Sequence, residues 1–414
     1  MNAGDPQPDV PRLGRNAVAA IFLLALVARL GATAAVGFST LRFGDASRYL
    51  YAATELAQHG RYPDRTEAYF FRPPAYPLFL AAATLGRTEC IPAAKIANGV
   101  LGALAAVLLA LLSARIFRHR EIAIASGAAA ALHPSFVLLS TDVQSEPLFL
   151  LFLLLAGLFL LSASDRPTAR LALAAGAMLG LAALTRSSAL ALAPLLLAPL
   201  LDRRQPRHIG AKLAGAALLG FLLSLAPWTL RNALRFHELL PVSDAGGVSL
   251  YAGNSGWTRS FYEVRSREEY VRWLDDFDLD LRARLAHIEA NGPVSPGRRS
   301  AAFARLATDE IRADPARSLR LFARKAWHWV RPYPTPWYWG PAVVAGIGVL
   351  YLLLYVLAVL GLRRSPRRGV AAFCIAVLVV SMLVHVALQV VWRYRIPYWD
   401  PILILYGVFG AWRR

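Results

Sequence analysis

The chain has 414 residues, of which 57% are hydrophobic and 17% are charged, and its formal net charge is +19. So apolar a composition, with a positive mean hydropathy, is rare in soluble globular domains and predicts an all-α polytopic membrane protein. The positive charge does not indicate a nucleic acid partner, because the basic residues form short clusters between apolar runs. Two cysteines, Cys90 and Cys374, are too few for a disulfide framework and form no plausible metal or redox site.

Ten apolar runs are candidates for membrane spans, although several are shorter than the roughly 20 residues that a spanning α-helix needs. The first run follows Arg12 and Arg15, contains Arg29, and exceeds the roughly 7–15 apolar residues of a signal peptide, so we expect it to be retained. The ten runs cover residues 17–37, 93–112, 122–139, 147–161, 171–184, 188–201, 213–230, 341–362, 370–391 and 396–411.

An eleventh apolar segment, residues 73–85, is too short to span and is predicted to lie as a helix in the outer interface. With this segment outside, the basic clusters "ARIFRHRE", "SDRPTAR", "LDRRQPRH", "LRRSPRR" and the final "WRR" all fall on the side of the N-terminus. That side is the cytoplasm by the positive-inside rule. If the segment crossed the membrane, every later basic loop would face outward.

This topology divides the chain into four parts. They are a cytoplasmic tail (1–16), an N-terminal membrane domain of seven spans (17–230, with a first outer loop at 38–92), an extracytoplasmic module (231–339) and a C-terminal segment of three spans (340–414). The module holds 13 of the 26 acidic residues, as a soluble insertion would. Its opening, "PVSDAGGVSLYAGNSG", predicts turns and short extended pieces, and residues 266–325 are predicted to be mostly helical.

The first outer loop carries an acid, Asp45, directly before a helical pattern that contains Tyr49 and ends at Gly60. One interpretation is that Asp45 only caps this helix by accepting backbone N–H bonds. Against that stands a set of arginines that the topology places on the same outer face: Arg48, Arg72, Arg186, Arg393 and Arg395. Each arginine alone is also explained by snorkelling from a span end.

A second acidic region, "STDVQSEPLF", places Asp142 and Glu146 four residues apart at the outer surface. On a continuous helix these two carboxylates share a face, where like charges destabilise the helix unless a cation, a proton or a substrate is near. The alternative is a solvated helix entry, with Glu146 favoured by the N-terminal helix dipole.

The order of six segments resembles the bacterial GT-C glycosyltransferases related to the protein mannosyltransferase and aminoarabinose transferase families (glycosyltransferase family 39). These segments are "FGDASRY", "RPPAYPLFLA", "SEPLFLLF", "LAALTRSSAL", "PWTLRNALRF" with "LPVSDAGGVSLYAGN", and "RYRIPYWDPIL". The resemblance extends from about Arg15 to the C-terminus. It implies a GT-C fold in the bacterial cytoplasmic membrane, with the active site on the extracytoplasmic face.

The resemblance also implies roles for individual residues. Asp45 matches the catalytic acid of the family, and Glu146 matches a second acid at the start of a later span. Many relatives have another acid directly after the first one, where this chain has Ala46. A metal-bridged acid pair at Asp45 is therefore not expected. No cofactor is assigned, and a divalent cation stays an open alternative that the sequence does not indicate. The residues expected to bind the lipid phosphate or sugar are Arg48, Tyr49, Arg72, Tyr76, Asp142, Arg186, Arg393 and Arg395.

The expected reaction is transfer of a sugar from a polyprenyl monophosphate to an acceptor hydroxyl by inverting displacement, with Asp45 as the base. Arginines would stabilise the departing phosphate, and we expect Arg72 and Arg395 to approach the same phosphate. The acceptor is a glycan, a lipid or a protein, and the sequence does not name the sugar. Two alternatives stay open: a transporter or flippase for lipid-linked sugars, and a glycolipid-binding assembly protein without activity.

Overall fold

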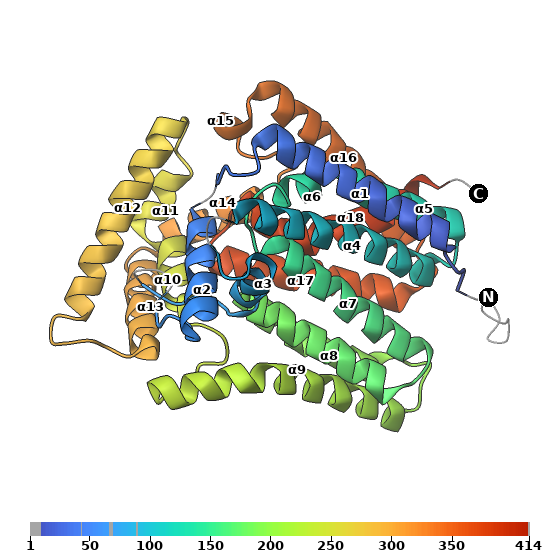
Figure 1. The fold of residues 1–414 in the computed structure, drawn as a ribbon, viewed down its shortest axis with the longest axis horizontal. Coiled ribbons are helices and arrows are strands. Elements are labelled where there is room, and N and C mark those ends of the chain that lie inside the picture. Colours follow the sequence, from blue (N-terminus) through green and yellow to red (C-terminus); the bar gives the residue numbers. More distant parts are fainter. Residues whose placement is uncertain (1–9, 43, 66–68, 88–89, 413–414) are drawn as a thin grey trace.

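The computed structural model describes residues 10–42, 44–65, 69–87 and 90–412, and every regular element among them is a helix. Figure 1 shows a bundle of long helices with a smaller helical group at one end. The bundle contains α1 (Arg15–Val36), α4 (Ile91–Phe117), α5 (Arg120–Leu132), α6 (Pro134–Leu139), α7 (Glu146–Asp165), α8 (Ala169–Thr185), η1 (Ser187–Leu201), α9 (Arg207–Phe236), α16 (Pro341–Arg363), α17 (Arg368–Ala387) and α18 (Ile396–Ala411). The prediction of an all-α fold is confirmed.

The remaining helices belong to the loops predicted to lie on the outer side and to residues 231–339, called the module. They are α2 (Asp45–His59), α3 (Ala75–Thr84), α10 (Ala245–Asn254), α11 (Gly256–Phe261), α12 (Arg267–Ile288), α13 (Pro296–Ala313), α14 (Pro315–Val330), α15 (Pro336–Trp339) and the short η2 (Trp392–Arg395). In Figure 1, α2 lies between the bundle and the group formed by α10 to α13. The start of α1 and the end of α18 both lie at the opposite end of the bundle, which agrees with the predicted placement of the two termini on one side.

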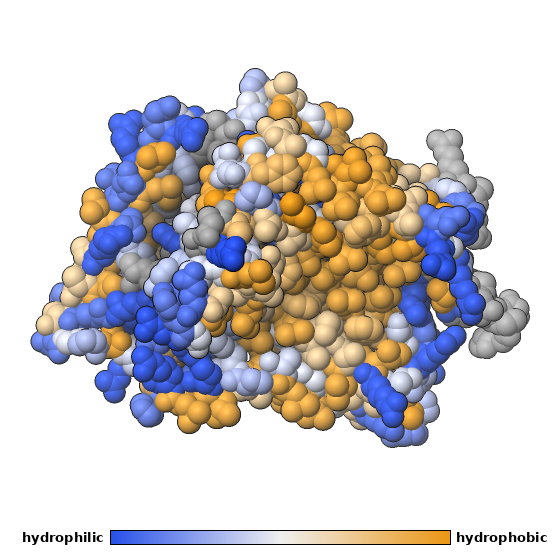
Figure 2. All heavy atoms as spheres, viewed as in Figure 1, coloured by the Kyte–Doolittle hydropathy of each residue, from blue (hydrophilic) through white to orange (hydrophobic). Residues whose placement is uncertain are grey.

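An apolar surface covers the face of the bundle that is seen in Figure 2. Figure 2 shows an orange surface over the bundle, bounded by blue, hydrophilic surfaces at the module and at the opposite edge. Six of the described helices are at least 18 residues long and apolar enough to cross a membrane: α1, α4, α7, α9, α16 and α17. The protein is therefore a multi-pass membrane protein. The other four predicted crossings correspond to shorter elements, so the number ten stays a prediction.

The predicted span 122–139 is not one helix, because it breaks between α5 and α6 at His133 and Pro134. Pro134 has no N–H group to donate to the carbonyl of Ala130, so that backbone acceptor is left free inside the bundle. Arg29 of α1, which is fully buried, donates to the carbonyl oxygens of Ala131 at 2.9 Å and Ala130 at 3.3 Å. The intramembrane arginine of the first span therefore stabilises the interrupted helix.

The predicted span 188–201 has a different backbone form from the other runs. It is the 3₁₀-helix η1, and it contains Pro194 and Pro199, which cannot donate the backbone bonds of an α-helix. A 3₁₀-helix rises about 2.0 Å per residue, so its 15 residues extend about 30 Å, close to the thickness of the hydrocarbon core. A run that is too short for an α-helical span is long enough in this form.

The prediction of turns and extended pieces at the opening of the module is wrong. Residues 245–254 form the helix α10, although this stretch contains three glycines. Two of them allow close approach of neighbouring backbone: a Cβ atom on Gly247 would lie 1.8 Å from the carbonyl oxygen of Ser300, and one on Gly253 would lie 1.5 Å from that of Leu388. These glycines serve helix packing rather than turns, a distinction that local propensity does not make.

Candidate active site

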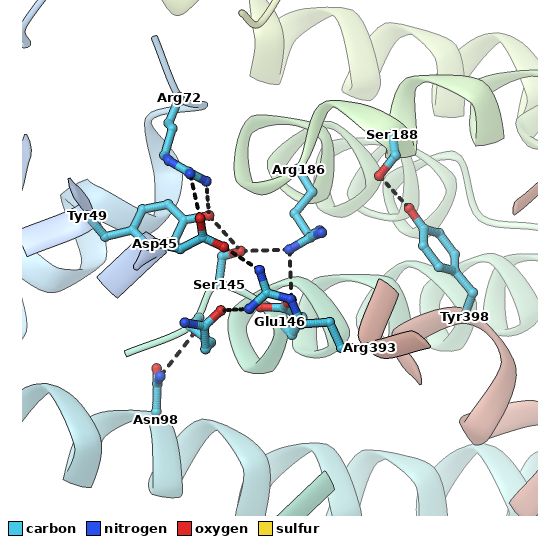
Figure 3. A network of polar contacts seen from close by, with 11 residues as sticks. Asp45, Tyr49, Arg72, Asn98, Ser145, Glu146, Arg186, Ser188, Arg393 and Tyr398 are labelled. Atoms are coloured by element: carbon cyan, nitrogen blue, oxygen red, sulfur yellow. Dashed lines mark hydrogen bonds and ion pairs between the residues drawn. The ribbon is translucent and has the colours of Figure 1, made fainter. Parts of the chain in front are cut away.

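Two carboxylates and three arginines meet where the bundle adjoins the module (Figure 3). Arg72 donates to Asp45 Oδ1 at 2.7 Å, and Arg393 donates to Asp45 Oδ2. Deeper in the site, Arg186 Nη1 lies 3.0 Å and Arg393 Nε lies 3.7 Å from Glu146 Oε1. We call these five residues the arginine cluster. They come from five separate segments of the chain, so the fold has to bring them together.

Asp45 is the first residue of α2, and its side chain does not cap that helix. Gly44 occupies the cap position and makes no side-chain cap bond, while both carboxylate oxygens of Asp45 point to arginines. The interpretation of Asp45 as only a helix cap is therefore wrong. The chain before it is fixed by two buried polar groups: Lys95 donates to the carbonyl oxygens of Gly37 and Thr40, and Asp142 accepts from the backbone N–H of Arg42 at 2.9 Å.

Arg72 is fixed by its backbone and by an aromatic face. The hydroxyl of Tyr62 donates to the Arg72 carbonyl oxygen at 2.7 Å. The guanidinium lies 4.7 Å from the ring centre of Tyr49 and donates to the Tyr49 hydroxyl at 3.2 Å. Tyr49 in turn donates to Ser145 Oγ at 3.1 Å, which links this side of the cluster to the start of α7.

Arg186 and Glu146 form the buried floor of the site. Arg186 follows the last residue of α8 in an extended conformation, donates to Ser145 Oγ at 3.1 Å, and lies 4.8 Å from the ring centre of Tyr394. The Glu146 side chain is 1% exposed, whereas that of Asp45 is 22% exposed. Asp45 is therefore the more accessible of the two carboxylates, and Glu146 is enclosed beside Arg186 and Arg393.

Arg393 joins both carboxylates and also donates to Gln144 Oε1. Gln144 belongs to the irregular stretch before α7, which Asn98 of α4 holds by donating to the carbonyl oxygens of Asp142 at 2.8 Å and Gln144 at 3.1 Å. A polar residue inside the membrane bundle thus fixes the position of the loop that receives Arg393.

The cluster carries a formal charge of +1, because three arginines face two carboxylates. Burial acts to raise the pKa of the Asp45 carboxyl, but the charges of Arg72 and Arg393 together outweigh it and hold this pKa well below its usual range. Asp45 is therefore ionised at neutral pH. The remaining positive charge, on side chains that keep some exposure, suits an anionic ligand.

Four of the residues expected at the site lie elsewhere. Arg48 is exposed, and its charge acts on Asp278 of the module. Tyr76 is buried below Tyr49, with the ring centres 4.8 Å apart, and accepts from Asn98. The other two expected residues, Asp142 and Arg395, lie in structural networks of their own.

Asp142 is fully buried and accepts backbone N–H bonds, among them that of Val143 at 2.8 Å. Residues 140–145 are not helical, so Asp142 and Glu146 do not share the continuous helix face that was expected. Arg395 is also fully buried, and it donates to the carbonyl oxygens of Trp329 and Arg331. Its guanidinium lies 4.7 Å from the ring centre of Tyr351. The arginine that shares Asp45 with Arg72 is therefore Arg393, not Arg395 as expected.

The site also contains residues that the sequence did not single out. Gln144 and Ser145 lie between the two acids of "STDVQSEPLF", and Lys95 and Asn98 stand three residues apart inside a predicted span. Polar residues at this spacing in an apolar run share a helix face and are expensive in lipid, which is the signal that could have identified the second pair.

Comparison with known proteins identifies the fold and a similarity to one family. The family model of dolichyl-phosphate-mannose-protein mannosyltransferases matches residues 72–230. The apo structure of the oligosaccharyltransferase from Archaeoglobus fulgidus aligns with 95% of this chain and 50% of its own length, at 14% identity and a TM-score of 0.60. The chain therefore has the GT-C fold, and residues 72–230 are similar to the protein mannosyltransferase family.

Two further solved structures align with this GT-C protein. The same archaeal enzyme, AglB, in complex with an inhibitory peptide and a dolichol-phosphate, aligns with 95% of this chain and 49% of its own, at 13% identity and a TM-score of 0.57. ArnT from Cupriavidus metallidurans bound to undecaprenyl phosphate aligns with 95% and 76%, at 15% identity and a TM-score of 0.43, so the fold assignment depends on the archaeal structures. No curated protein sequence matches the chain.

The GT-C chain spans about half the length of the archaeal oligosaccharyltransferase structures. The stretch that the family model matches begins at Arg72 and includes Glu146 and Arg186. Asp45 and Arg393 lie outside it, on either side. The places of Asp45 and Arg393 in the cluster are therefore known from the structure rather than from the family model.

Proposed function

We propose that this protein transfers a sugar from a polyprenyl monophosphate to an acceptor hydroxyl on the extracytoplasmic side of a bacterial cytoplasmic membrane. The observation that carries the proposal is the arginine cluster, in which Arg72 and Arg393 bind the accessible carboxylate of Asp45 and Arg186 lies against the buried Glu146. The archaeal relative was solved with a dolichol-phosphate, which supports a lipid phosphate as the class of donor.

The charge of the cluster fits the donor and the leaving group. The phosphate diester of a lipid-linked sugar carries one negative charge, which balances the formal +1 of the cluster. When the bond between the anomeric carbon and the phosphate oxygen breaks, the phosphate gains a second negative charge. Arg72, Arg186 and Arg393 are held by other contacts, so they stabilise this developing charge without rearranging.

Asp45 is the base in this mechanism. It takes the proton from the acceptor hydroxyl while that oxygen attacks the anomeric carbon from the side opposite the phosphate, and the configuration is inverted. In the free protein the two bound arginines make Asp45 a weak base. The donor phosphate competes for the same guanidinium groups, so its binding raises the pKa of Asp45 toward the usual range and makes it more basic when the acceptor arrives.

Glu146 supports the site from below. It is almost fully buried and lies against Arg186 and Arg393, so it balances their charge in the absence of donor. The difference in exposure from Asp45 favours one accessible base and one fixed structural acid. The ten crossings, the extracytoplasmic side and the division into four segments belong to the same proposal.

Release of labelled sugar from a defined polyprenyl phosphate donor tests the function. Purified protein in lipid nanodiscs is incubated with the donor, with and without extracted cell-envelope acceptors, and the labelled products are separated. We expect sugar to leave the lipid in the wild type and the rate to fall at least a hundredfold in Arg393→Gln, on the order of 3 kcal/mol of lost transition-state stabilisation.

The matched control is Arg61→Gln, which removes an exposed arginine that pairs with Glu55 of the same predicted outer segment at 3.2 Å. This variant should keep the wild-type rate. Donor binding without any release of sugar would point to a binding protein, and movement of the intact donor across the bilayer would point to a transporter. Either result would overturn the proposed activity.

A further inference from the structure

The helix α10 of the module lies between the two loops that carry Arg72 and Arg393. At its start, Asp244 Oδ1 accepts from the backbone N–H of Phe71 at 2.9 Å. At its end, Asn254 Nδ2 donates to the carbonyl oxygen of Ala387, the last residue of α17, at 2.9 Å. One helix is thus bonded to both segments that supply Asp45 with its arginine partners.

The attachment at the start of α10 is buried and charged. Arg299 of α13 donates to Asp244 Oδ2 at 2.6 Å, and both side chains are almost fully buried. Phe71 is fully buried as well, and its ring stacks on Phe236 with the ring centres 5.6 Å apart. The backbone at residue 71 is therefore fixed to the module, and Arg72 is the next residue.

The attachment at the end of α10 contains a buried lysine. Lys325 of α14 donates to the carbonyl oxygen of Gly253 at 3.0 Å, to Asn254 Oδ1 at 2.9 Å and to the carbonyl oxygen of Leu388 at 3.1 Å. Because only glycine leaves room at position 253 for the Leu388 carbonyl, the two backbones are in direct contact. The loop that starts at Leu388 reaches Arg393 five residues later.

Between these attachments, α10 has little freedom to bend or slide. Its ten residues give a length of about 15 Å. Gly247 packs directly on the backbone of Ser300 in α13, and its N–H donates to the Ser300 hydroxyl at 3.0 Å. Near the middle of α10, the Tyr251 hydroxyl donates to Asp280 of α12 at 2.8 Å.

We propose that α10 is a spacer that sets the separation of the Arg72 and Arg393 guanidinium groups, and that Asp244 and Asn254 are positioning residues for phosphate binding. The inference rests on the proposed function for the identity of the ligand, whereas the spacing itself does not. The extracytoplasmic module then has a role in donor binding, because it determines whether two arginines reach one phosphate.

The spacer makes a specific statement about additivity. The two attachments act in series to fix the distance between the Arg72 and Arg393 segments. Releasing either attachment therefore lets this distance vary, and releasing both has no further effect. Two unrelated structural contacts this far apart would instead lower phosphate affinity additively in free energy. This difference separates a positioning role from a general contribution to folding.

Three altered proteins test the proposal. The first combines Asp244→Ala with Arg299→Met, which removes the contact to Phe71 without leaving a buried unpaired charge. The second combines Asn254→Ala with Lys325→Met, which removes the side-chain bonds to Ala387 and Leu388. The third combines all these changes. The control is Asp280→Ala, which removes a contact of α10 to α12 but leaves both attachments intact.

Two readouts are needed on the full chain in nanodiscs. The first is the distance distribution between spin labels introduced by Phe70→Cys and Gln389→Cys in a Cys90→Ser, Cys374→Ala background. The second is the affinity for farnesyl monophosphate. We expect a broader distance distribution and roughly tenfold weaker binding in the first and second variants, no further change in the third, and wild-type behaviour in the control.

Each outcome decides the proposal. An unchanged distance distribution, or additive losses of affinity in the third variant, would overturn the spacer. A broader distribution with unchanged phosphate affinity would show that the spacing does not serve binding, which also overturns the positioning role. If the wild type binds no farnesyl monophosphate but the distributions broaden as expected without additivity, the spacer stands and the proposed donor class fails.

Discussion

The substitution Asp45→Asn is predicted to change donor binding and turnover in opposite directions. Asn keeps the size of the side chain, and it loses both the negative charge and the ability to take a proton. Asp45 accepts one charge-assisted hydrogen bond from each of Arg72 and Arg393, and such bonds contribute about 1.5–3 kcal/mol each. A phosphate that binds these arginines has to replace part of that interaction.

The magnitude follows from these contacts. We assume that donor binding in the wild type breaks the equivalent of one such bond, which costs about 1.5 kcal/mol. Asp45→Asn removes this cost, so a polyprenyl monophosphate should bind roughly tenfold more tightly. Turnover should meanwhile fall by about 10²–10⁴-fold, the usual contribution of a general base. A residue that only maintained the fold would weaken both quantities together.

The assay combines calorimetric titration with a polyprenyl monophosphate, sugar transfer from a labelled donor, and thermal unfolding on one preparation. A matched control is Asp64→Asn, because Asp64 also pairs with two arginines, Arg231 and Arg235, but at an exposed position away from the cluster. The control should keep both affinity and turnover. Weaker phosphate binding in Asp45→Asn, or near-normal turnover, would refute the assignment of Asp45 as a base in competition with the phosphate.

Three further predictions concern pH, the choice of arginine and topology. Because the pKa of Asp45 is lowered in the free protein, kcat/KM should fall only when the pH drops below about 4. Because the bound donor raises this pKa, kcat should begin to fall at a higher pH. A decrease of kcat/KM near pH 6 that Asp45→Asn abolishes would contradict this prediction. Arg393→Gln should weaken binding of a polyprenyl monophosphate about 10- to 100-fold without a large change in melting temperature, whereas Arg395→Gln should lower the melting temperature and leave affinity in the folded fraction unchanged; the reverse pattern would exchange their roles. Cysteines introduced at Arg118 and Arg364 should react with an impermeant reagent only after the membrane is opened, and labelling in intact cells would reject the topology.

The fold class could be predicted from the sequence because membrane insertion depends on apolar length and on charge asymmetry, both of which are local properties of the chain. The interrupted helix at His133 and the 3₁₀ form of η1 could not. Each depends on the surroundings of the segment. The guanidinium of Arg29, for example, replaces the backbone donor that is missing at Pro134. A single span read in isolation does not show that such a partner exists.

The residue types of the candidate site could also be predicted, but the contact partners of each residue could not. Charge, aromatic neighbours and position on the outer face are the same for Arg393 and Arg395, which are two residues apart in η2. The structure gives them different partners: Arg393 reaches Asp45, and Arg395 reaches the carbonyl of Trp329. Only the packing of η2 against the module and the bundle decides which of the two faces the cluster.

A structure of the protein with a bound polyprenyl monophosphate would test the central claim most directly. The proposal predicts that the phosphate lies in the arginine cluster, with oxygens about 2.8 Å from the guanidinium groups of Arg72 and Arg393 and with Asp45 released from at least one of them. Density for the phosphate at another basic surface, with both arginines still bound to Asp45, would contradict it.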